Sequence, residues 1–407
     1  MEISVVAAPG LATRAPGRAV TRAFQSSAQR RLFVQIEIFD DLEAARPIFA
    51  EIEKDACATP YQRYDFVAAW LSAVGEARAI APLIVAFRDD NGLATAILPL
   101  ALSRSGGLRT AAFVGGKHAN FHMGVFRRGL SIDPAAATEL LTRVAEVAGL
   151  DALLLVNQPE AWQGEPNPLA VLGQQDSPSR GHATKLGRDF DDWFAAHYST
   201  GARKKLRKKA GRLAEKGVAS TIVARDEAAV ERTLAAFFAQ KRAQAAATAR
   251  VNDFEPPEVA RFLRTLATRS AGVDPALELH ALFCGERIVA VFGGLAAGSR
   301  FCGMITSHDV DPEIARCSPG ELLILEVIRN LTERGFSTFD LGVGEARYKD
   351  TICEIEERLS DLAIGFTARG RLVAKLFLVR QTVKRWIKQT PWALRAADAF
   401  RRCARWP

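Results

Sequence analysis

Residues 301–349 read FCGMITSHDVDPEIARCSPGELLILEVIRNLTERGFSTFDLGVGEARYK, a stretch in which short apolar runs alternate with polar loops. The apolar run 301–307 predicts a strand that the turn residues of 308–312 end. The continuous apolar residues of 321–331 predict a helix packed against a sheet, and 336–342 predict a second, short strand. An acid, a phenol, a guanidinium and an amine follow within 343–349. This order of strand, loop, helix, strand and polar cluster is that of an active site.

The loop before the helix carries residues that helix starts favour. Ser318 is expected to be the N-cap, with Pro319 in the first helical position and Glu321 where a capping-box acid belongs. A loop that leads into a helix suits phosphate groups, because free N–H groups and the helix dipole meet the negative charge there. The residues expected to hold a phosphate-bearing ligand are Arg316, Cys317, Ser318, Gly320, Glu321 and Leu322.

The stretch resembles the GNAT superfamily of acyl-CoA N- or O-acyltransferases, in the branch of the cellulose-biosynthesis CelD/BcsL proteins, with Fem-type peptidyl transferases as distant relatives. The motifs that carry the resemblance are Ser318-Pro319-Gly320, Asp340-Leu341-Gly342-Val343-Gly344 and Tyr348-Lys349. The usual GNAT pyrophosphate motif, Q/R-x-x-G-x-G/A, is not matched cleanly, because Arg316 is present but the glycines are displaced. The resemblance extends from Leu32 to about Thr367.

The resemblance implies the α+β (α/β) class, with two pseudo-duplicated mixed-sheet domains in a tandem GNAT-like fold. It also implies acetyl-CoA or another acyl-CoA as co-substrate, and no metal. Tyr348 matches the general acid of many GNAT enzymes, and Lys349 is placed to stabilise the oxyanion of the donor carbonyl. The candidates for the base that takes the proton of the acceptor are Asp340, Glu345 and His308.

Composition sets the limits for these expectations. The 407 residues exceed what one hydrophobic core organises, so two domains are expected. With 48% hydrophobic and 25% charged residues, and no apolar run near the roughly 20 residues of a membrane span, the chain is of the soluble class. Its six cysteines form no C-x-x-C pair, which favours a reducing cytoplasm over a disulfide framework or a zinc ribbon. A net charge of +8 allows nucleic-acid, anionic-lipid or phosphorylated partners.

One pattern of helices, hairpin, strand, helix and strand occurs twice. The first copy is predicted as strand 33–38, helices 42–54 and 64–74, hairpin 81–100, strand 110–114, helix 134–148 and strand 152–156. The second is predicted as strand 220–224, helices 227–246 and 257–270, hairpin 277–295, the stretch 301–342 and a last strand 361–366. The expected domains are therefore 32–180 and 189–367, between a disordered basic tail, 1–31, and a basic amphipathic helical segment, 368–407.

A glycine turn in the first copy carries two histidines. His118 and His122 are four residues apart, a spacing that binds zinc on a helix, but their neighbours include no acid and follow a strand, so no metal site is expected. The resemblance implies that the segment 114–116 lines the acceptor cleft, which makes His118, Asn120 and His122 candidate acceptor contacts. The alternative is a glycine turn with solvated histidines.

Residues 191–216 predict one basic helix that leads the second domain. Leu206, Ala210 and Leu213 share one face, and the opposite face is almost wholly cationic. Such a charge run is typical of a solvated helix. It also suits the phosphates of a cofactor, a lipid carrier, a polysaccharide precursor or tRNA, with Arg203 and Lys204 as candidate contacts.

The basic segment at the C-terminus has two interpretations. It is either a helix packed across the fold or a peripheral attachment to an anionic membrane, which the tryptophans at 386, 392 and 406 beside cations would suit. Pro391 interrupts the helical pattern. The expected location is the cytoplasm, with peripheral contact at the inner membrane as the second interpretation.

Three functions follow from these observations. The leading hypothesis is acyl-CoA-dependent acyl transfer to an amine or hydroxyl of a small-molecule, saccharide-linked or lipid-linked acceptor, in exopolysaccharide, cellulose or envelope biosynthesis. The second is a Fem-like transferase that uses aminoacyl-tRNA, which the lack of a predicted long helical hairpin between 220 and 283 disfavours. The third is a non-catalytic accessory protein of exopolysaccharide assembly with a degenerate acyltransferase fold.

Overall fold

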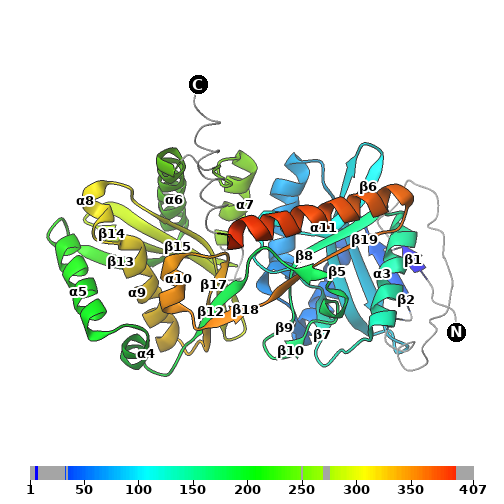
Figure 1. The fold of residues 1–407 in the computed structure, drawn as a ribbon, viewed down its shortest axis with the longest axis horizontal. Helices are drawn as coiled ribbons and strands as arrows, with labels where there is room; N and C mark the ends of the chain where they lie inside the picture. Colours follow the sequence, from blue (N-terminus) through cyan, green and yellow to red (C-terminus); the bar gives the residue numbers. More distant parts are fainter. Residues whose placement is uncertain (1–4, 8–32, 34, 249–250, 269–275, 391–407) are drawn as a thin grey trace. The chain divides into compact units, whose positions relative to one another are not determined.

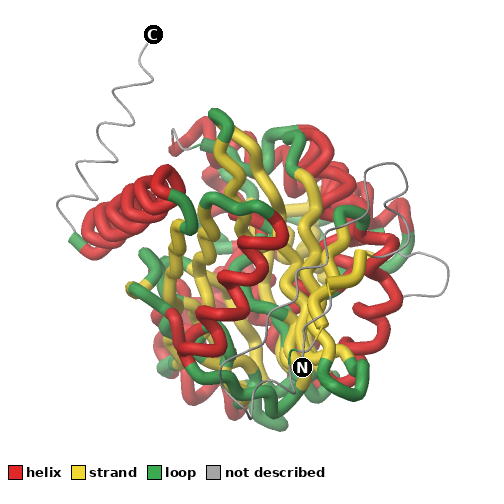
Figure 2. Tube along the Cα trace, turned by 90° about the vertical axis from the view of Figure 1, so that its right-hand side faces the viewer, coloured by secondary structure: helices red, strands yellow, loops and turns green. Residues whose placement is uncertain are grey.

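The computed structural model describes residues 5–7, 33, 35–248, 251–268 and 276–390. Contacts divide the chain into two units: unit 1 comprises 1–179 and 358–388, and unit 2 comprises 180–357 and 389–407. Each unit is a mixed sheet with helices packed on it (Figures 1 and 2). Most of the expected tail, 1–31, and the last residues, with Trp392 and Trp406, lie outside the described residues.

The sheet of unit 1 has the strand order β1-β2-β4-β5-β6-β8-β19-β11, and β7 pairs with both β5 and β3. Its strands are β1 (Val5–Ala7), β2 (Gln35–Phe39), β3 (Ala56–Cys57), β4 (Ala81–Arg88), β5 (Ala94–Ser105), β6 (Leu108–Phe113), β7 (Val125–Arg127), β8 (Ala152–Pro159), β11 (Gln175–Asp176) and β19 (Leu359–Gly365), and β9 (Ala161–Trp162) pairs with β10 (Glu165–Pro166) separately. Its helices are α1 (Leu42–Ile52), α2 (Tyr64–Trp70), α3 (Pro134–Ala148) and α11 (Ala368–Gln389).

Strand β1 lies within the segment that was expected to be a disordered tail. Residues Val5–Ala7 pair in parallel with β2, so this part of the prediction is wrong. Two consecutive valines favour an extended backbone, and the outer edge of β2 offers them a hydrogen-bonding partner.

The sheet of unit 2 has the strand order β13-β14-β15-β16-β17-β12-β18. Its strands are β12 (Gly181–Lys185), β13 (Ala219–Ala224), β14 (Leu277–Cys284), β15 (Arg287–Ala297), β16 (Arg300–His308), β17 (Thr338–Val343) and β18 (Ile355–Glu357). Its helices are α4 (Phe190–His197), α5 (Thr200–Ala214), α6 (Glu227–Thr248), α7 (Pro257–Ala267), α8 (Pro312–Ala315), α9 (Pro319–Glu333) and α10 (Arg347–Ile352).

The two halves of the chain exchange one strand each. Strand β12 follows the first half but pairs antiparallel with β17, and β19 follows the second half but pairs antiparallel with β8. The boundaries therefore differ from those expected, because 358–367 belongs with unit 1 and 180–188 with unit 2. Strand pairing over such separations leaves no trace in local periodicity, so the sequence could not reveal the exchange.

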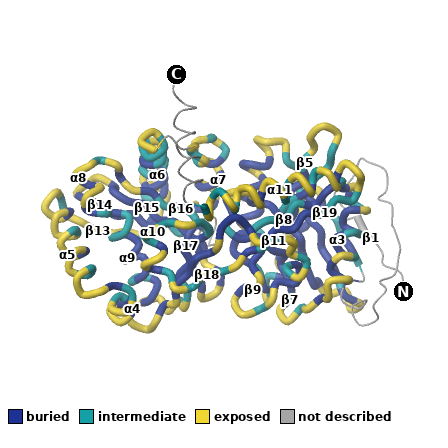
Figure 3. Tube along the Cα trace, viewed as in Figure 1, coloured by how far each residue is buried: buried dark blue, intermediate teal, exposed yellow. Residues whose placement is uncertain are grey.

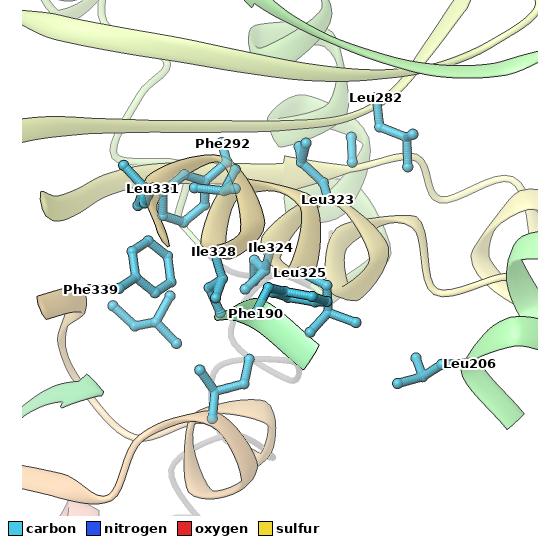
Figure 4. Packing of buried hydrophobic residues seen from close by; sticks show 14 of the residues in the cluster. Phe190, Leu206, Leu282, Phe292, Leu323, Ile324, Leu325, Ile328, Leu331 and Phe339 are labelled. Carbon is cyan, nitrogen blue, oxygen red and sulfur yellow. The ribbon is translucent and has the colours of Figure 1, made fainter. Parts of the chain in front are cut away.

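Helix α9 forms the centre of the hydrophobic core of unit 2. Leu323, Val327 and Leu331 are almost fully buried, and α9 lies over β14, β15 and β16. Figure 4 shows the side chains of α9 between those of the sheet and Phe190 of α4. The dense apolar pattern of 322–331, which only Glu326, Arg329 and Asn330 interrupt, thus results from burial on two sides.

The single basic helix predicted over 191–216 is in fact two helices. Tyr198 is extended, with φ −125° and ψ 123°, and Ser199 caps α5 by accepting a hydrogen bond from the N–H of Ala202 at 3.2 Å. Ser-Thr at 199–200 is a helix-start signal that the continuous helical pattern concealed.

Helix α11 packs on unit 1 through its small and polar residues. Gly370, Ala374 and Gln381 are buried, and the Gln381 amide donates to Asp361 Oδ2 at 2.8 Å. In the described part of the chain no helix is long and apolar enough to cross a membrane.

Candidate active site

Strands β16 and β17 are parallel but pair only where they begin. Their ladder holds three residue pairs, from Arg300–Thr338 to Cys302–Asp340, whereas β16 continues to His308 and β17 to Val343. On its other side β16 carries a β-bulge at Met304, because Gly293 faces Ile305 while Gly294 faces Gly303. Beyond the pair Cys302–Asp340 the ladder between the two strands ends, and the strands share no further residue pair. Strands β6 and β8 of unit 1 likewise pair only at Thr110–Ala152 and Ala111–Leu153.

The N-terminus of α9 follows the far end of β16. The N–H groups of Gly320 and Glu321 fall in the first turn, where a helix offers no acceptor for them. Ser318 is the N-cap residue as expected, but it has φ +52° and its side chain makes no capping hydrogen bond. Glu321 does not complete a capping box, since its carboxylate lies 3.4 Å from Lys209 Nζ of α5. The two capping bonds predicted from the sequence are therefore wrong, although the start of the helix is right.

His308 lies beside this helix start. A Cβ added to Gly320 would be 3.6 Å from His308 Nδ1, which places the imidazole next to the first turn of α9. Partial burial, with the Lys241 ammonium as a smaller cause, lowers the pKa of His308 from its ordinary value. A neutral imidazole at the end of β16 can accept a proton.

The remaining residues of the predicted phosphate loop, Arg316, Cys317 and Leu322, lie in three different environments. The Arg316 guanidinium is exposed and pairs with Glu313 at 2.7 Å, while Cys317 is buried with its thiol 3.6 Å from the carbonyl oxygen of Glu313. Leu322 lines a separate pocket of about 360 Å³ between α4, α5, β13 and α9. In Figure 4, Leu206 of α5 stands apart from Phe190 and Leu325, which also line this pocket.

Asp340 lies at the last residue pair of the ladder and is fully buried. Its Oδ2 accepts from Arg300 Nη2 at 2.5 Å, and its Oδ1 accepts from the N–H of Gly342 at 2.5 Å. Arg300 also donates to Glu357 at 2.6 Å. The carboxylate thus ties β17 to β16 and β18, and no part of it is exposed to an acceptor. Of the three candidate bases, Asp340 has the geometry of a structural ion pair.

Tyr348 and Lys349 lie on α10, a helix that was not predicted within the expected cluster of polar residues. Lys349 is buried, and its Nζ donates to the carbonyl oxygen of Gly342 in β17 at 3.0 Å. Burial, with Cys353 as a second cause, raises the pKa of Tyr348 to about 12, so the phenol is protonated near neutral pH. Glu345 is exposed and accepts from the N–H of Arg180 at 3.4 Å.

Two residues near this site were not predicted. Tyr198, at the end of α4, is 3% exposed, and its hydroxyl has no hydrogen-bond partner in the described part of the chain. Burial first, then Glu321 and Cys353, raises the pKa of this phenol. Burial and Asp340 raise the pKa of the Cys353 thiol to about 12. The charges of Glu321, at the start of α9, and of Cys353, at the end of α10, thus act on the Tyr198 phenol. In the sequence, only the helix break at 198–199 could have pointed to Tyr198.

The two candidate contacts on the basic helix lie on α5. This helix holds seven cationic side chains and no acidic one. Arg203 is partly buried and donates to Thr200 Oγ1 at 3.4 Å, whereas Lys204 is exposed. Apart from Leu206 and Leu213, most of α5 faces outward (Figure 3).

The glycine turn of unit 1 holds its histidines in the interior. His118 accepts from Trp70 Nε1 at 3.1 Å, and Asn120 donates to the Tyr61 hydroxyl at 2.9 Å. His122 is 1% exposed and stacks on Phe113, and burial lowers its pKa to about 4. The alternative of solvated histidines is therefore wrong, because the turn folds inward.

Known proteins resemble this chain in part of its sequence and in its fold. Residues 200–350 match the family model described as an acetyltransferase (GNAT) domain. Comparison with curated proteins gave no match. Among solved structures, FemX is similar with a TM-score of 0.56 and 9% identity, over 81% of this chain and 97% of that chain.

Two further structures are less similar. The C-terminal domain of a lysylphosphatidylglycerol synthetase from Agrobacterium fabrum has a TM-score of 0.46 and 12% identity, over 82% of this chain and 96% of that one. Yeast (Saccharomyces cerevisiae) N-myristoyltransferase with bound myristoyl-CoA has a TM-score of 0.42 and 10% identity, over 82% of this chain and 79% of that chain. At such identities a likeness concerns the fold alone. The fold prediction is confirmed: the chain has a mixed α/β, tandem GNAT-like fold, and residues 200–350, within its second unit, match the model of a GNAT acetyltransferase domain.

Proposed function

We propose that unit 2 transfers an acyl group, such as acetyl, from acyl-CoA to an amine or hydroxyl acceptor. The observation that carries this proposal is the divergence of β16 and β17 beyond Cys302 and Asp340, next to the start of α9. An extended pantetheine arm carries amides that can bond to strand backbone in the region where the β16–β17 ladder has ended. Its pyrophosphate can meet the first-turn N–H groups of Gly320 and Glu321, where the helix dipole also favours negative charge. Arg316 is close in sequence but would have to leave Glu313 to contribute.

The residues around this opening fit the steps of acyl transfer. The acceptor forms a bond to the donor carbonyl carbon and loses a proton, while the carbon–sulfur bond breaks and the thiolate takes a proton. We assign the first proton to His308, whose lowered pKa keeps its imidazole neutral, and the second to the Tyr348 hydroxyl, whose raised pKa keeps it protonated. Lys349 is the candidate for steadying the oxyanion. Asp340 holds β17 in place, and the exposed Glu345 is the weaker candidate base.

Calorimetric titration with acetyl-CoA tests the donor. Gly320→Asp introduces a side chain and a negative charge into the proposed phosphate site, so we expect affinity to fall at least tenfold. Gly201→Asp is the matched control, because Gly201 occupies the second position of α5 as Gly320 does in α9, and an added Cβ there meets nothing within 4 Å. Equal affinities in the two variants, with both proteins folded, would move the donor elsewhere.

Aminoacyl-tRNA as donor is the second candidate. The acid-free cationic face of α5 and the fold shared with FemX favour it. A chain that ignores acetyl-CoA but transfers the aminoacyl group of charged tRNA would support this alternative. Binding of neither donor would favour the non-catalytic accessory role. A place in exopolysaccharide, cellulose or envelope biosynthesis stays a prediction from family resemblance.

A further inference from the structure

Helix α11 carries an exposed apolar stripe. Its members are Leu372, Leu376, Val379, Val383 and Trp386, whose exposed fractions are 60, 59, 54, 49 and 51%. At 3.6 residues per turn these positions fall within an arc of about 80°. Gly370, Ala374 and Gln381, which are buried against unit 1, lie on the opposite side of the helix. The stripe therefore points away from the sheet that α11 covers.

Cations border this stripe on both sides. Helix α11 contains seven Lys and Arg residues and no acidic residue. Lys375 falls about 60° to one side of Leu372, and Arg369 and Arg380 fall about 60–80° to the other. Lys375 and Arg380 are exposed, and neither forms an ion pair with any described residue. The outer half of α11 is thus an apolar strip between two cationic rows.

We propose that α11 is a docking surface for an anionic lipid bilayer, on which it lies parallel to the membrane. An amphipathic helix with this layout buries its apolar face at the level of the lipid headgroups while its Lys and Arg side chains meet anionic phosphates. Trp386 at the C-terminal part of the stripe suits that interfacial depth. The proposal does not rest on acyl transfer, which uses residues of unit 2.

Charge distinguishes the bilayer from a second copy of this chain. Two α11 stripes packed face to face would bring cationic rows against cationic rows, with no acid on the helix to compensate. An anionic surface meets both the strip and the rows. The exposed apolar side chains also lie on one continuous helix, which runs straight (Figure 1), as a flat partner requires.

Vesicle co-sedimentation of the full chain tests the apolar part. We expect binding to vesicles of phosphatidylcholine with 30% phosphatidylglycerol, and binding at least tenfold weaker to pure phosphatidylcholine. The double variant Leu376→Gln/Val383→Gln should lose at least tenfold in affinity for the anionic vesicles. Val171→Gln/Val218→Gln is the matched control, because those valines are 47% and 79% exposed but lie outside α11; it should bind within twofold of the wild type.

A second pair of variants tests the contribution of the cationic side chains of α11 to vesicle binding. Lys375→Glu/Arg380→Glu should weaken binding tenfold or more, whereas Lys54→Glu/Arg104→Glu, an equal change of charge at exposed residues outside α11, should cost less than threefold. An equal loss in both double variants would mean attraction by net charge alone and would overturn the assignment to α11. The proposal would also fail if Leu376→Gln/Val383→Gln bound like the wild type. Analytical ultracentrifugation tests a second copy of the chain as the partner. If the wild type is a dimer and Leu376→Gln/Val383→Gln is a monomer, the stripe binds a second copy and the proposal is overturned.

Discussion

Lys349 is the residue whose replacement separates mechanism from structure. If its ammonium steadies the oxyanion, Lys349→Met should lower kcat by roughly two to three orders of magnitude, as for loss of one oxyanion donor, with donor affinity nearly unchanged. Steady-state kinetics with the acceptor, together with acetyl-CoA titration, measures both quantities. Arginine should rescue little, because a planar guanidinium cannot replace a compact ammonium in a buried site.

Other outcomes would assign Lys349 differently. A raised donor KM with normal kcat would mean that it grips a phosphate. A lower melting temperature that accompanies the loss of activity would mean that its bond to the Gly342 carbonyl, 3.0 Å long, serves mainly to hold β17. Wild-type kcat in the Met variant would remove it from the mechanism.

His122 predicts a pH dependence of stability. Burial lowers its pKa from 6.5 to about 4 in the folded chain, so the unfolded chain binds the proton more readily. The stabilising contribution is therefore complete above about pH 6.5 and is lost as pH falls through 4, which amounts to about 3 kcal/mol. Chemical denaturation of His122→Gln at pH 7 and pH 4 should show a loss smaller by about that amount than in the wild type. Identical losses would mean that His122 is not buried as a neutral group.

At the scale of elements, the tie between β16, β17 and β18 should be a main source of stability. Asp340→Asn removes a fully buried carboxylate from Arg300. We expect a loss of about 3 kcal/mol, the lower end for breaking a buried ion pair, because Glu357 still neutralises Arg300. Glu345→Gln is the control, since an exposed acid should cost less than about 0.5 kcal/mol. Similar unfolding free energies for the two variants would contradict the structural role of Asp340.

The helices and strands also show which elements the hydrophobic periodicity of the sequence could predict. Helix α3 has the expected bounds, and the hairpins β4–β5 and β14–β15 lie where alternating apolar runs and turn residues placed them. The break at Tyr198 was missed, because residues on both sides continue one helical pattern. Helix α10 was missed because six residues, 347–352, are too few for a period to show.

The sequence predicted most of the elements that carry the candidate residues, but not the contacts of these residues. His308 ends β16, Ser318-Pro319-Gly320 lies at the start of α9, and Asp340 to Val343 form the last part of β17, whereas Tyr348 and Lys349 lie on α10. The pairing of Asp340 with Arg300 and of Glu321 with Lys209 depends on segments 40 and 112 residues away. No local pattern specifies such partners, so the carboxylates resembled free catalytic groups until the fold supplied their cations.

For the whole molecule, the strand exchange predicts that the C-terminal part of the chain stabilises unit 1. A chain truncated after Glu357 loses β19 and α11, and with them the partner of β8. In hydrogen exchange, amides of β8 that bond to β19 should lose protection, whereas those of the β14–β15 hairpin in unit 2 should keep it. Unchanged protection in β8 would show that β19 contributes little to the unit 1 sheet. A chain truncated after Gln389 is the control, because it retains both elements.

Leu359 of β19 pairs with Pro159 of β8, so during biosynthesis β8 has to wait for a partner strand that is made much later. Two hundred residues separate these positions, so a ribosome adding 5–20 residues each second needs roughly 10–40 s to make the second strand after the first. During that interval the nascent chain exposes the flank of β8, an apolar strand edge of the kind that pairs with other chains. A chaperone that binds the exposed edge of β8, or a wide spacing of the ribosomes on the mRNA, would keep nascent chains from pairing with one another during that interval. Overexpression should therefore yield aggregates seeded by incomplete chains, and slowing initiation, which spaces the ribosomes apart, should raise the soluble yield.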